Sequence, residues 1–203
     1  MKFQFLALAM LASSPAFASG NFLVDFEKNW DYANGDVAEY YNGGTAADGS
    51  AGPNLGVSFS GISGLSNDAD FTYYSGAPSA TGVAYVYDTA FMNVAGGVSG
   101  GLQFFYSSPE AVAGAIKAYS GLNGSGDLLG VFDFAANSSA AYDQWSQALF
   151  SFAGTAQSFD LSAGANIVAL DNVSSVPVPA GFWLLGSGLA MVGAIGRRGK
   201  AAA

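Results

Sequence analysis

Short apolar and aromatic runs, separated by clusters of glycine, serine, asparagine and aspartate, constrain the fold of this chain more than any other feature. In the stretch NFLVDFE, Phe22, Val24 and Phe26 fall on one face of an extended chain, and the residues between them fall on the other. This two-residue period is typical of a half-buried β-strand. The chain also holds 28 glycines, 16 phenylalanines and 10 tyrosines, a composition that favours strands and turns over a helical bundle.

Runs of the same kind recur about every 10 to 20 residues, with turn-forming stretches such as NGG and NGSGD between them. They are LGVSFSG, GVAYVYD, GLQFFYSS, AGAIKAYSG, LLGVFDF, QALFSFAG, QSFDLS and NIVALDNVS. This spacing predicts one all-β domain, an antiparallel two-sheet sandwich of the jelly-roll or concanavalin-like type. One stretch, AAYDQWSQAL, has helical spacing among Tyr142, Trp145 and Leu149, but the LFSF that ends it favours a strand.

The first eighteen residues form the pattern of a secretory signal peptide. Lys2 supplies a basic start, FQFLALAML a hydrophobic middle, and Ala16-Phe17-Ala18 a cleavage site of the A-x-A type. We therefore expect residues 1–18 to be removed on export and residues 19–175 to form the β-sandwich domain outside the cytoplasm. Residues 176–203 then form a separate C-terminal signal.

An uncharged run of 17 residues, from Ala180 to Gly196, lies near the C-terminus. As a helix rising ~1.5 Å per residue it spans about 26 Å, slightly less than a ~30 Å hydrocarbon core, and predicts a short transmembrane helix. Arg197, Arg198 and Lys200 follow it. The positive-inside rule places this basic stop in the cytoplasm and the domain outside. The alternative is a buried core helix of a soluble domain.

A proline motif, Val176-Pro177-Val178-Pro179-Ala180, precedes the hydrophobic run. Proline motif, short hydrophobic helix and basic end, in this order at the end of an exported chain, resemble the sorting signal of PEP-CTERM proteins, in particular the VPLPA variant of Gram-negative bacteria. The resemblance covers residues 176–200. This copy has Val178 where leucine is usual and has no glutamate between the prolines.

The resemblance implies processing by an exosortase, a membrane-embedded cysteine protease-transpeptidase that recognises the proline motif from the periplasmic side. It also implies a transient inner-membrane anchor, with the domain in the periplasm, followed by transfer to the cell surface or extracellular matrix. Such proteins often belong to organisms that make exopolysaccharide. Each proline disfavours helix for the residue before it, so we expect the motif to be extended and accessible.

The charge distribution excludes one class of partner. All 15 carboxylates lie between Asp25 and Asp171, and the bases within that span are Lys28 and Lys117. Such a surface repels phosphate backbones, so we expect no nucleic-acid partner. Divalent cations or neutral sugars suit this surface better.

The chain has no histidine and no cysteine. A serine or cysteine nucleophile needs a neighbouring base, usually histidine or lysine, and the usual zinc, haem and iron–sulfur ligands are missing as well. We therefore predict no enzymatic activity. The alternative is a polysaccharide hydrolase, because that chemistry needs only two carboxylates, although no pair stands out among the fifteen.

Calcium is the inorganic ligand that the acidic loops suit best, because it accepts several carboxylate, amide and carbonyl oxygens. Asp25 and Glu27 share a strand face near the start of the domain, and Asp171 and Asn172 close its last strand. In jelly-roll sandwiches the terminal strands often pair, so Asp25, Glu27 and Asp171 are predicted to share a structural calcium ion. The alternative is that they are solvated surface groups. Two polar loops are further candidates: Asn67, Asp68 and Asp70, and Asp31, Asn34 and Asp36.

Aromatic side chains are candidates for a platform that binds sugar rings, because an aromatic face packs against C–H groups and a phenol adds a hydrogen bond. The alternative is that alternate rings fill the core, and the sequence singles out no one residue as a ligand contact. The candidates are Trp30, Tyr32, Tyr40-Tyr41, Tyr73-Tyr74, Tyr85 and Tyr87.

Taken together, these features predict an exported, exosortase-sorted surface or matrix protein. Its non-catalytic β-sandwich domain is expected to act in adhesion or in exopolysaccharide and biofilm association. The alternatives are the two-carboxylate hydrolase and a purely structural coat or matrix subunit.

Overall fold

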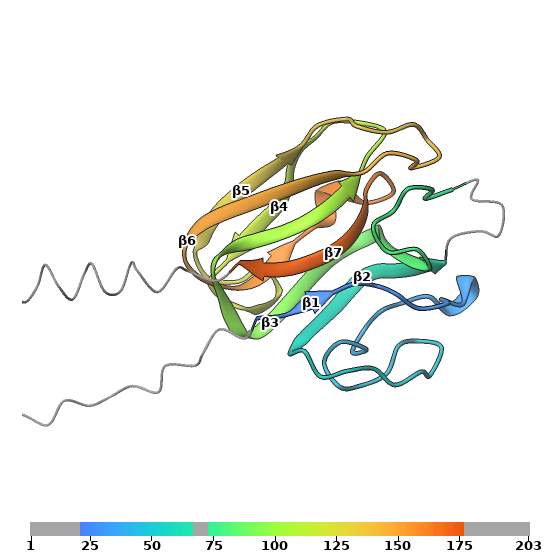
Figure 1. Cartoon of the computed structure of the whole chain (residues 1–203). Coiled ribbons are helices and arrows are strands. Elements are labelled where there is room, and N and C mark those ends of the chain that lie inside the picture. Colours follow the sequence, from blue (N-terminus) through green and yellow to red (C-terminus); the bar gives the residue numbers. More distant parts are fainter. Residues whose placement is uncertain (1–20, 67–72, 177–203) are drawn as a thin grey trace, which may run out of the picture.

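The computed structural model describes residues 21–66 and 73–176. Every strand pair within these residues is antiparallel, and the helices among them are three short 3₁₀ turns, so the predicted all-β antiparallel class is confirmed (Figure 1). The strands are β1 (Leu23–Val24), β2 (Val57–Ser66), β3 (Gly82–Ser107), β4 (Val112–Tyr119), β5 (Leu128–Phe134), β6 (Ser146–Asp160) and β7 (Ala169–Val176). The 3₁₀ turns are η1 (Tyr32–Asn34), η2 (Leu122–Gly124) and η3 (Ser162–Gly164).

Hydrogen bonds join the described strands into one sheet in the order β1-β7-β3-β6-β4-β5, with β2 paired to β3. The first and last strands are neighbours, with Leu23 opposite Ser174 and Val24 opposite Val173. The pairing of the terminal strands expected from the sequence is therefore present. Both ends of the described chain lie at one end of the domain, and η1 lies at the opposite end (Figure 1).

Strand β3 is one strand of 26 residues, although the sequence predicts two separate runs there. Its register against β6 shifts between Asn93 and Val98 and again between Ser99 and Gly101. Gly97 and Gly100 have φ values of 75° and 105°, which side-chain-bearing residues rarely adopt. Glycine bulges of this kind bend a strand without ending it. The two halves of β3 thus reach different parts of the same sheet.

The bend in β3 lets the sheet curl around a common core. Leu170 of β7 lies opposite both Ala84 and Tyr106, so the two halves of β3 flank the last strand. Side chains from five strands line one enclosed apolar space: Phe59, Met92, Leu102, Phe104, Ile116, Phe159, Leu170 and Val173. All of them are buried. Burying a side chain of this size contributes about 1.5–3 kcal/mol to stability, and this core holds the curled sheet together.

The alternating burial at the start of the domain is confirmed, but strand β1 covers Leu23–Val24 alone and Phe26 has φ of 53°, so the expected strand face shared by Asp25 and Glu27 is wrong. Phe22, Val24 and Phe26 are buried, whereas Leu23 between them is 52% exposed. The structure also decides between helix and strand in the stretch AAYDQWSQAL. Tyr142 occupies a turn with φ of 56°, and strand β6 begins four residues later at Ser146. The strand interpretation is therefore confirmed.

The predicted signal peptide and most of the predicted sorting signal lie outside the described residues. Val176, the first residue of the proline motif, is the last residue of β7 and pairs with Gly101. Among residues 21–66 and 73–176, no helix has the length and apolar character needed to cross a bilayer. The predicted span from Ala180 to Gly196 and the basic stop at Arg197, Arg198 and Lys200 remain predictions.

Candidate functional site: a tyrosine-lined groove

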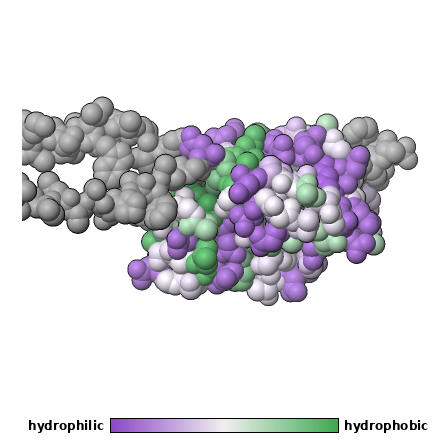
Figure 2. All heavy atoms as spheres, turned by 90° about the horizontal axis from the view of Figure 1, so that it is seen from below, coloured by the Kyte–Doolittle hydropathy of each residue, from purple (hydrophilic) through white to green (hydrophobic). Residues whose placement is uncertain are grey.

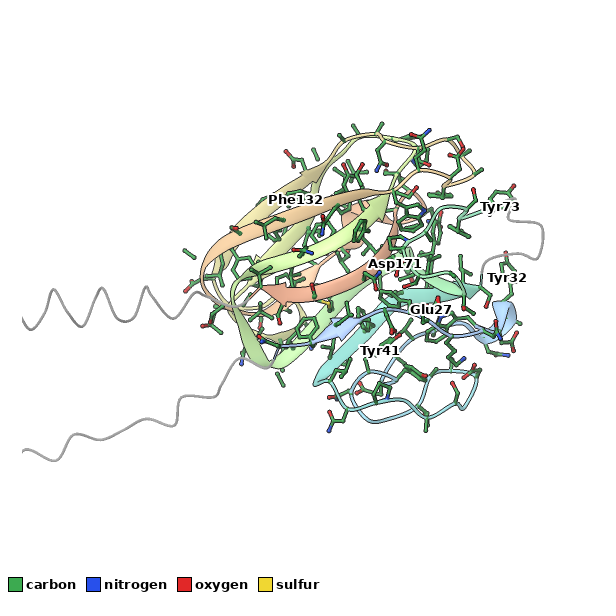
Figure 3. All side chains as sticks on the ribbon, viewed as in Figure 1. Glu27, Tyr32, Tyr41, Tyr73, Phe132 and Asp171 are labelled. Atoms are coloured by element: carbon green, nitrogen blue, oxygen red, sulfur yellow. The ribbon has the colours of Figure 1, made fainter. Side chains whose placement is uncertain are left out.

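Two adjoining hollows of about 430 and 460 Å³ share Tyr32, Leu65 and Tyr74 in their walls. We call this continuous hollow the tyrosine groove. Figure 3 shows Tyr32 and Tyr73 at the end of the domain that lies away from the two ends of the described chain. The tyrosines of the groove are Tyr32, Tyr73, Tyr74, Tyr85 and Tyr87, and the other lining residues are Ala33, Gly35, Asp36, Ser63, Leu65 and Ser66.

The 3₁₀ turn η1 presents Tyr32 to solvent. The Asp31 carboxylate accepts a hydrogen bond from the Ala33 amide at 3.0 Å and caps the turn, and Tyr32 is 88% exposed. Hydrogen bonds from Asn34 and Ala33 lower the pKa of Asp31. The turn is then tied to β2, because the Gly64 amide donates to the Gly35 carbonyl at 2.7 Å. An added Cβ on Gly35 would lie 2.6 Å from the Gly64 carbonyl oxygen, so this close approach requires glycine.

Three tyrosines form a packed wall behind the groove. The rings of Tyr74 and Tyr142 stack with centroids 5.3 Å apart, and Tyr85 meets Tyr142 edge-on at 5.8 Å. The Tyr85 and Tyr142 hydroxyl oxygens lie 3.4 Å apart, and the Tyr74 amide donates to the Ala141 carbonyl at 2.9 Å. Burial raises the pKa of both Tyr74 and Tyr142, so these phenols are neutral and can donate hydrogen bonds. The wall is therefore fixed in place before any ligand arrives.

Two carboxylates hold the segment that carries Tyr73 and Tyr74. The Ser79 amide donates to Asp171 Oδ2 at 2.7 Å, and the Thr81 amide and hydroxyl both donate to Glu27. Asp171 is fully buried. Burial raises its pKa to about 6, against the lowering effect of the hydrogen bonds from Ser79, and repulsion from Glu27 adds to the rise. These contacts link the groove to strand β7 and to the segment after β1.

Of the three carboxylates predicted to bind calcium, Glu27 lies close enough to Asp171 for its charge to raise the pKa of Asp171. Each one accepts hydrogen bonds from the chain, and Asp25 Oδ1 accepts from the Glu27 amide at 3.2 Å and the Tyr41 hydroxyl at 3.3 Å. Among the described residues, no group of three or more acidic, histidine or cysteine side chains is placed to hold a metal ion. A calcium ion at Asp25, Glu27 and Asp171 remains a prediction.

The structure describes one of the two polar loops that are further candidates for calcium. Asn67, Asp68 and Asp70 lie outside the described residues. In the other loop, the Asn34 side-chain amide donates to Asp31 Oδ2 at 3.0 Å. Asp36 lines the groove instead.

The aromatic residues named from the sequence separate into two groups. Tyr32, Tyr73, Tyr74, Tyr85 and Tyr87 line the groove, whereas Trp30, Tyr40 and Tyr41 pack together elsewhere. The ring centroids of Trp30 and Tyr40 are 5.5 Å apart, and those of Tyr40 and Tyr41 are 4.9 Å apart. Trp30 and Tyr41 are buried and belong to the core.

Sequence reasoning missed Tyr142, which supports the groove from behind. Its place in a stretch with helical spacing hid this role, since only the folded chain brings Tyr142 against Tyr74 and Tyr85. Aromatic residues flanked by turn formers were the one available signal.

Carboxylates are sparse in the described hollows. Asp36 is the single carboxylate among the described residues that line the groove. A smaller polar hollow, of about 330 Å³, contains Glu39 together with Asn42, Ser58, Asn93 and Asn123. A two-carboxylate glycosidase needs a facing pair, so the described part of the groove suits binding better than hydrolysis.

Large apolar side chains are also exposed outside the groove. Figure 2 shows a strip of hydrophobic residues crossing one face of the domain, on a surface that is otherwise hydrophilic or intermediate. The exposed large apolar residues outside the groove are Leu23, Leu122, Leu128, Val131 and Leu149. Exposed apolar side chains are common on protein surfaces, so we assign no function to these.

Comparison with known proteins gives little further information. No family model and no curated protein matches the chain. Among solved structures, it is similar to a glycoside hydrolase family 43 arabinoxylan arabinofuranohydrolase from Bacillus subtilis in complex with cellotetraose, at 12% identity and a TM-score of 0.38. The match covers 52% of this chain and 24% of that chain, so it spans about a quarter of the hydrolase's length. A likeness this weak carries no argument about function.

Proposed function

We propose that this chain is an exported, non-catalytic surface or matrix protein whose tyrosine groove binds carbohydrate, in adhesion or in association with exopolysaccharide. One observation carries the proposal: five tyrosines gather around one continuous hollow at one end of the domain. Aromatic faces with phenolic hydroxyls at their rim offer both surfaces that a sugar ring needs, one for its C–H groups and one for its hydroxyls.

The exposure of the groove supports a role in recognition. Tyr32 and Tyr73 are 88% and 51% exposed, so their rings are accessible to a ligand. Tyr74, Tyr85 and Tyr87 line the interior of the same hollow. A sugar ring entering between these two sets would remove apolar surface from water on both sides.

The direction of the groove agrees with attachment through the C-terminus. The described chain ends at Val176 at one end of the domain, and Tyr32 and Tyr73 lie at the other (Figure 3). We propose that a transient inner-membrane anchor holds the chain and that an exosortase then processes the motif from Val176 to Ala180. We also propose that the curled sheet is a two-sheet sandwich of the jelly-roll or concanavalin-like type. A domain attached in this way would present the groove to its surroundings.

A binding experiment tests the groove. The exported domain is titrated with a panel of soluble polysaccharides, including the one made by the producing organism, and Tyr32→Ala and Tyr73→Ala are compared with wild type. We expect each substitution to raise the Kd about two- to tenfold, because one aromatic contact contributes about 0.5–1.5 kcal/mol.

Leu128→Ala is the matched control, because Leu128 is 53% exposed and lies outside the groove. It should bind as wild type does. Binding that is unaffected by both tyrosine substitutions would contradict the proposal, and so would release of new reducing ends from the bound polysaccharide, which would favour the hydrolase.

Cell fractionation tests the sorting signal. Replacing Pro177 and Pro179 by alanine should leave the full-length protein in the membrane fraction, because the exosortase would no longer recognise the motif. Unchanged release to the surface or medium would show that this motif is not the recognised one.

A further inference from the structure

We propose that the groove prefers a polysaccharide with free amino groups, an amino-sugar chain, over neutral or acidic chains. This inference rests on the proposed carbohydrate-binding function and adds the chemical class of the ligand. The feature that carries it is the Asp36 carboxylate, which lies among the groove tyrosines.

Asp36 gives the groove a negative charge at a defined point. It is exposed and lines the second hollow together with Tyr32, Tyr74, Tyr85 and Tyr87. The ion pair found within the described residues joins Lys28 and Asp48, so no described cation neutralises Asp36. Burial is the main cause that raises the pKa of Tyr87, to about 12, and a hydrogen bond to the Asp36 carboxylate is the next. Asp36 and Tyr87 are therefore neighbours in the groove.

An ammonium group suits this combination of carboxylate and rings. Aromatic faces attract cations through their quadrupole, most strongly where several rings surround the charge. The carboxylate adds a direct electrostatic contact and can accept hydrogen bonds from the same group. A neutral sugar would contact the ring faces but would make no ionic contact with Asp36.

The rest of the domain has the same electrostatic preference. Fifteen carboxylates and two lysines lie between Asp25 and Asp171. Lys28 is engaged by Asp48 and lies 4.4 Å from the centroid of the Trp30 ring, and Lys117 lies on β4 opposite Asp160. Neither lysine lines the groove. The negative field therefore attracts cationic chains and repels uronic acids.

The shape of the groove indicates a chain rather than a single sugar. The two hollows share Tyr32, Leu65 and Tyr74, so a ligand occupying one continues directly into the other. Consecutive sugars of one polymer can fill both. An isolated monosaccharide would contact only part of the tyrosine lining.

The test compares three oligosaccharides of equal length by isothermal titration calorimetry: a glucosamine oligomer with its amines protonated, the fully N-acetylated oligomer, and an oligogalacturonate. Wild type is expected to bind them in that order of decreasing affinity. Asp36→Asn should weaken binding of the glucosamine oligomer about two- to fivefold, the range of an exposed ion pair, and leave the N-acetylated oligomer unchanged. Asparagine keeps an oxygen that can still face Tyr87.

Asp127→Asn removes the same charge from an exposed position outside the groove and should have a much smaller effect. Equal losses in Asp36→Asn and Asp127→Asn would show that the preference comes from net charge alone and would overturn this inference. Tyrosine-dependent binding without a preference for amines would also overturn it, while leaving carbohydrate binding intact. Absence of tyrosine-dependent binding to any saccharide would overturn the proposed function itself.

Discussion

The buried carboxyl group of Asp171 should make the stability of the domain depend on pH in an unusual direction. Asp171 is fully buried with no cation beside it among the described residues, and its oxygens accept hydrogen bonds from the Ser79 and Asn172 amides, each at 2.7 Å. Burial is the main reason that its pKa rises from 3.8 to about 6 in the folded protein. The perturbation is Asp171→Asn, which removes the titrating group and keeps nearly the same shape.

The magnitude follows from the rise in pKa. At about 1.4 kcal/mol for each tenfold change in proton affinity, a rise from 3.8 to about 6 corresponds to about 3 kcal/mol. Because the folded-state pKa of Asp171 is the higher one, the folded protein binds the proton more tightly than the unfolded chain. This contribution to stability is complete below about pH 4, is lost as the pH rises to about 6, and stays absent above that.

Urea denaturation of wild type and Asp171→Asn between about pH 4 and pH 7 measures this effect. The free energy of unfolding of wild type, relative to the variant, should fall by about 2–3 kcal/mol over that range. Asparagine turns an NH₂ group toward one of the two amides, and this costs stability equally at every pH. It shifts the variant curve without changing its slope.

Asp127→Asn is the control, because it makes the same substitution at an exposed position. Its curve should follow that of wild type. Parallel curves for wild type and Asp171→Asn would refute the reasoning, since they would show that burial of Asp171 does not favour its protonated form.

Three further predictions concern stability. Asp48→Asn should destabilise the domain by about 1–3 kcal/mol in urea, because it removes the negative charge that pairs with the largely buried Lys28 ammonium; an unchanged midpoint would contradict this. Gly61→Ala, at a register shift between β2 and β3, should cost at least about 1 kcal/mol, because Gly61 has φ of 65° and an added Cβ would lie 2.2 Å from the Thr89 carbonyl oxygen; wild-type stability would show that the backbone relaxes freely there. If the three carboxylates named from the sequence share calcium, EDTA should lower the melting temperature, and an identical melt in EDTA refutes that site.

Sequence patterns predicted a strand well where one apolar run corresponds to one strand. The stretch LLGVFDF coincides with β5, Leu128–Phe134, and the alternation of Phe22, Val24 and Phe26 matches their burial. The joining of two runs into β3 could not be predicted in the same way. Glycines between two apolar runs indicate a turn when the runs pair with each other, but here both runs pair with β7. Only the non-local pairing distinguishes a bulge from a turn.

In the candidate site, too, local features could be predicted and non-local contacts could not. Tyr32 and Tyr73 were named from the sequence as two of eight aromatic candidates, and both line the groove. Tyr41 was named on equal terms, yet it is buried against Phe26, with ring centroids 5.7 Å apart. Tyr142 was not connected to the site, because its contacts to the groove come from parts of the chain more than fifty residues away. Residue type could be predicted, but convergence on one hollow could not.

The claim that the tyrosine groove binds carbohydrate is tested most directly by NMR of the domain with isotope-labelled tyrosines, titrated with a glucosamine oligomer. We predict saturable shifts of the ring signals of Tyr32, Tyr73, Tyr74, Tyr85 and Tyr87, with the Tyr119 signal unmoved. Shifts that spare these five rings, or no saturable shifts with this or any neutral oligomer, would contradict it.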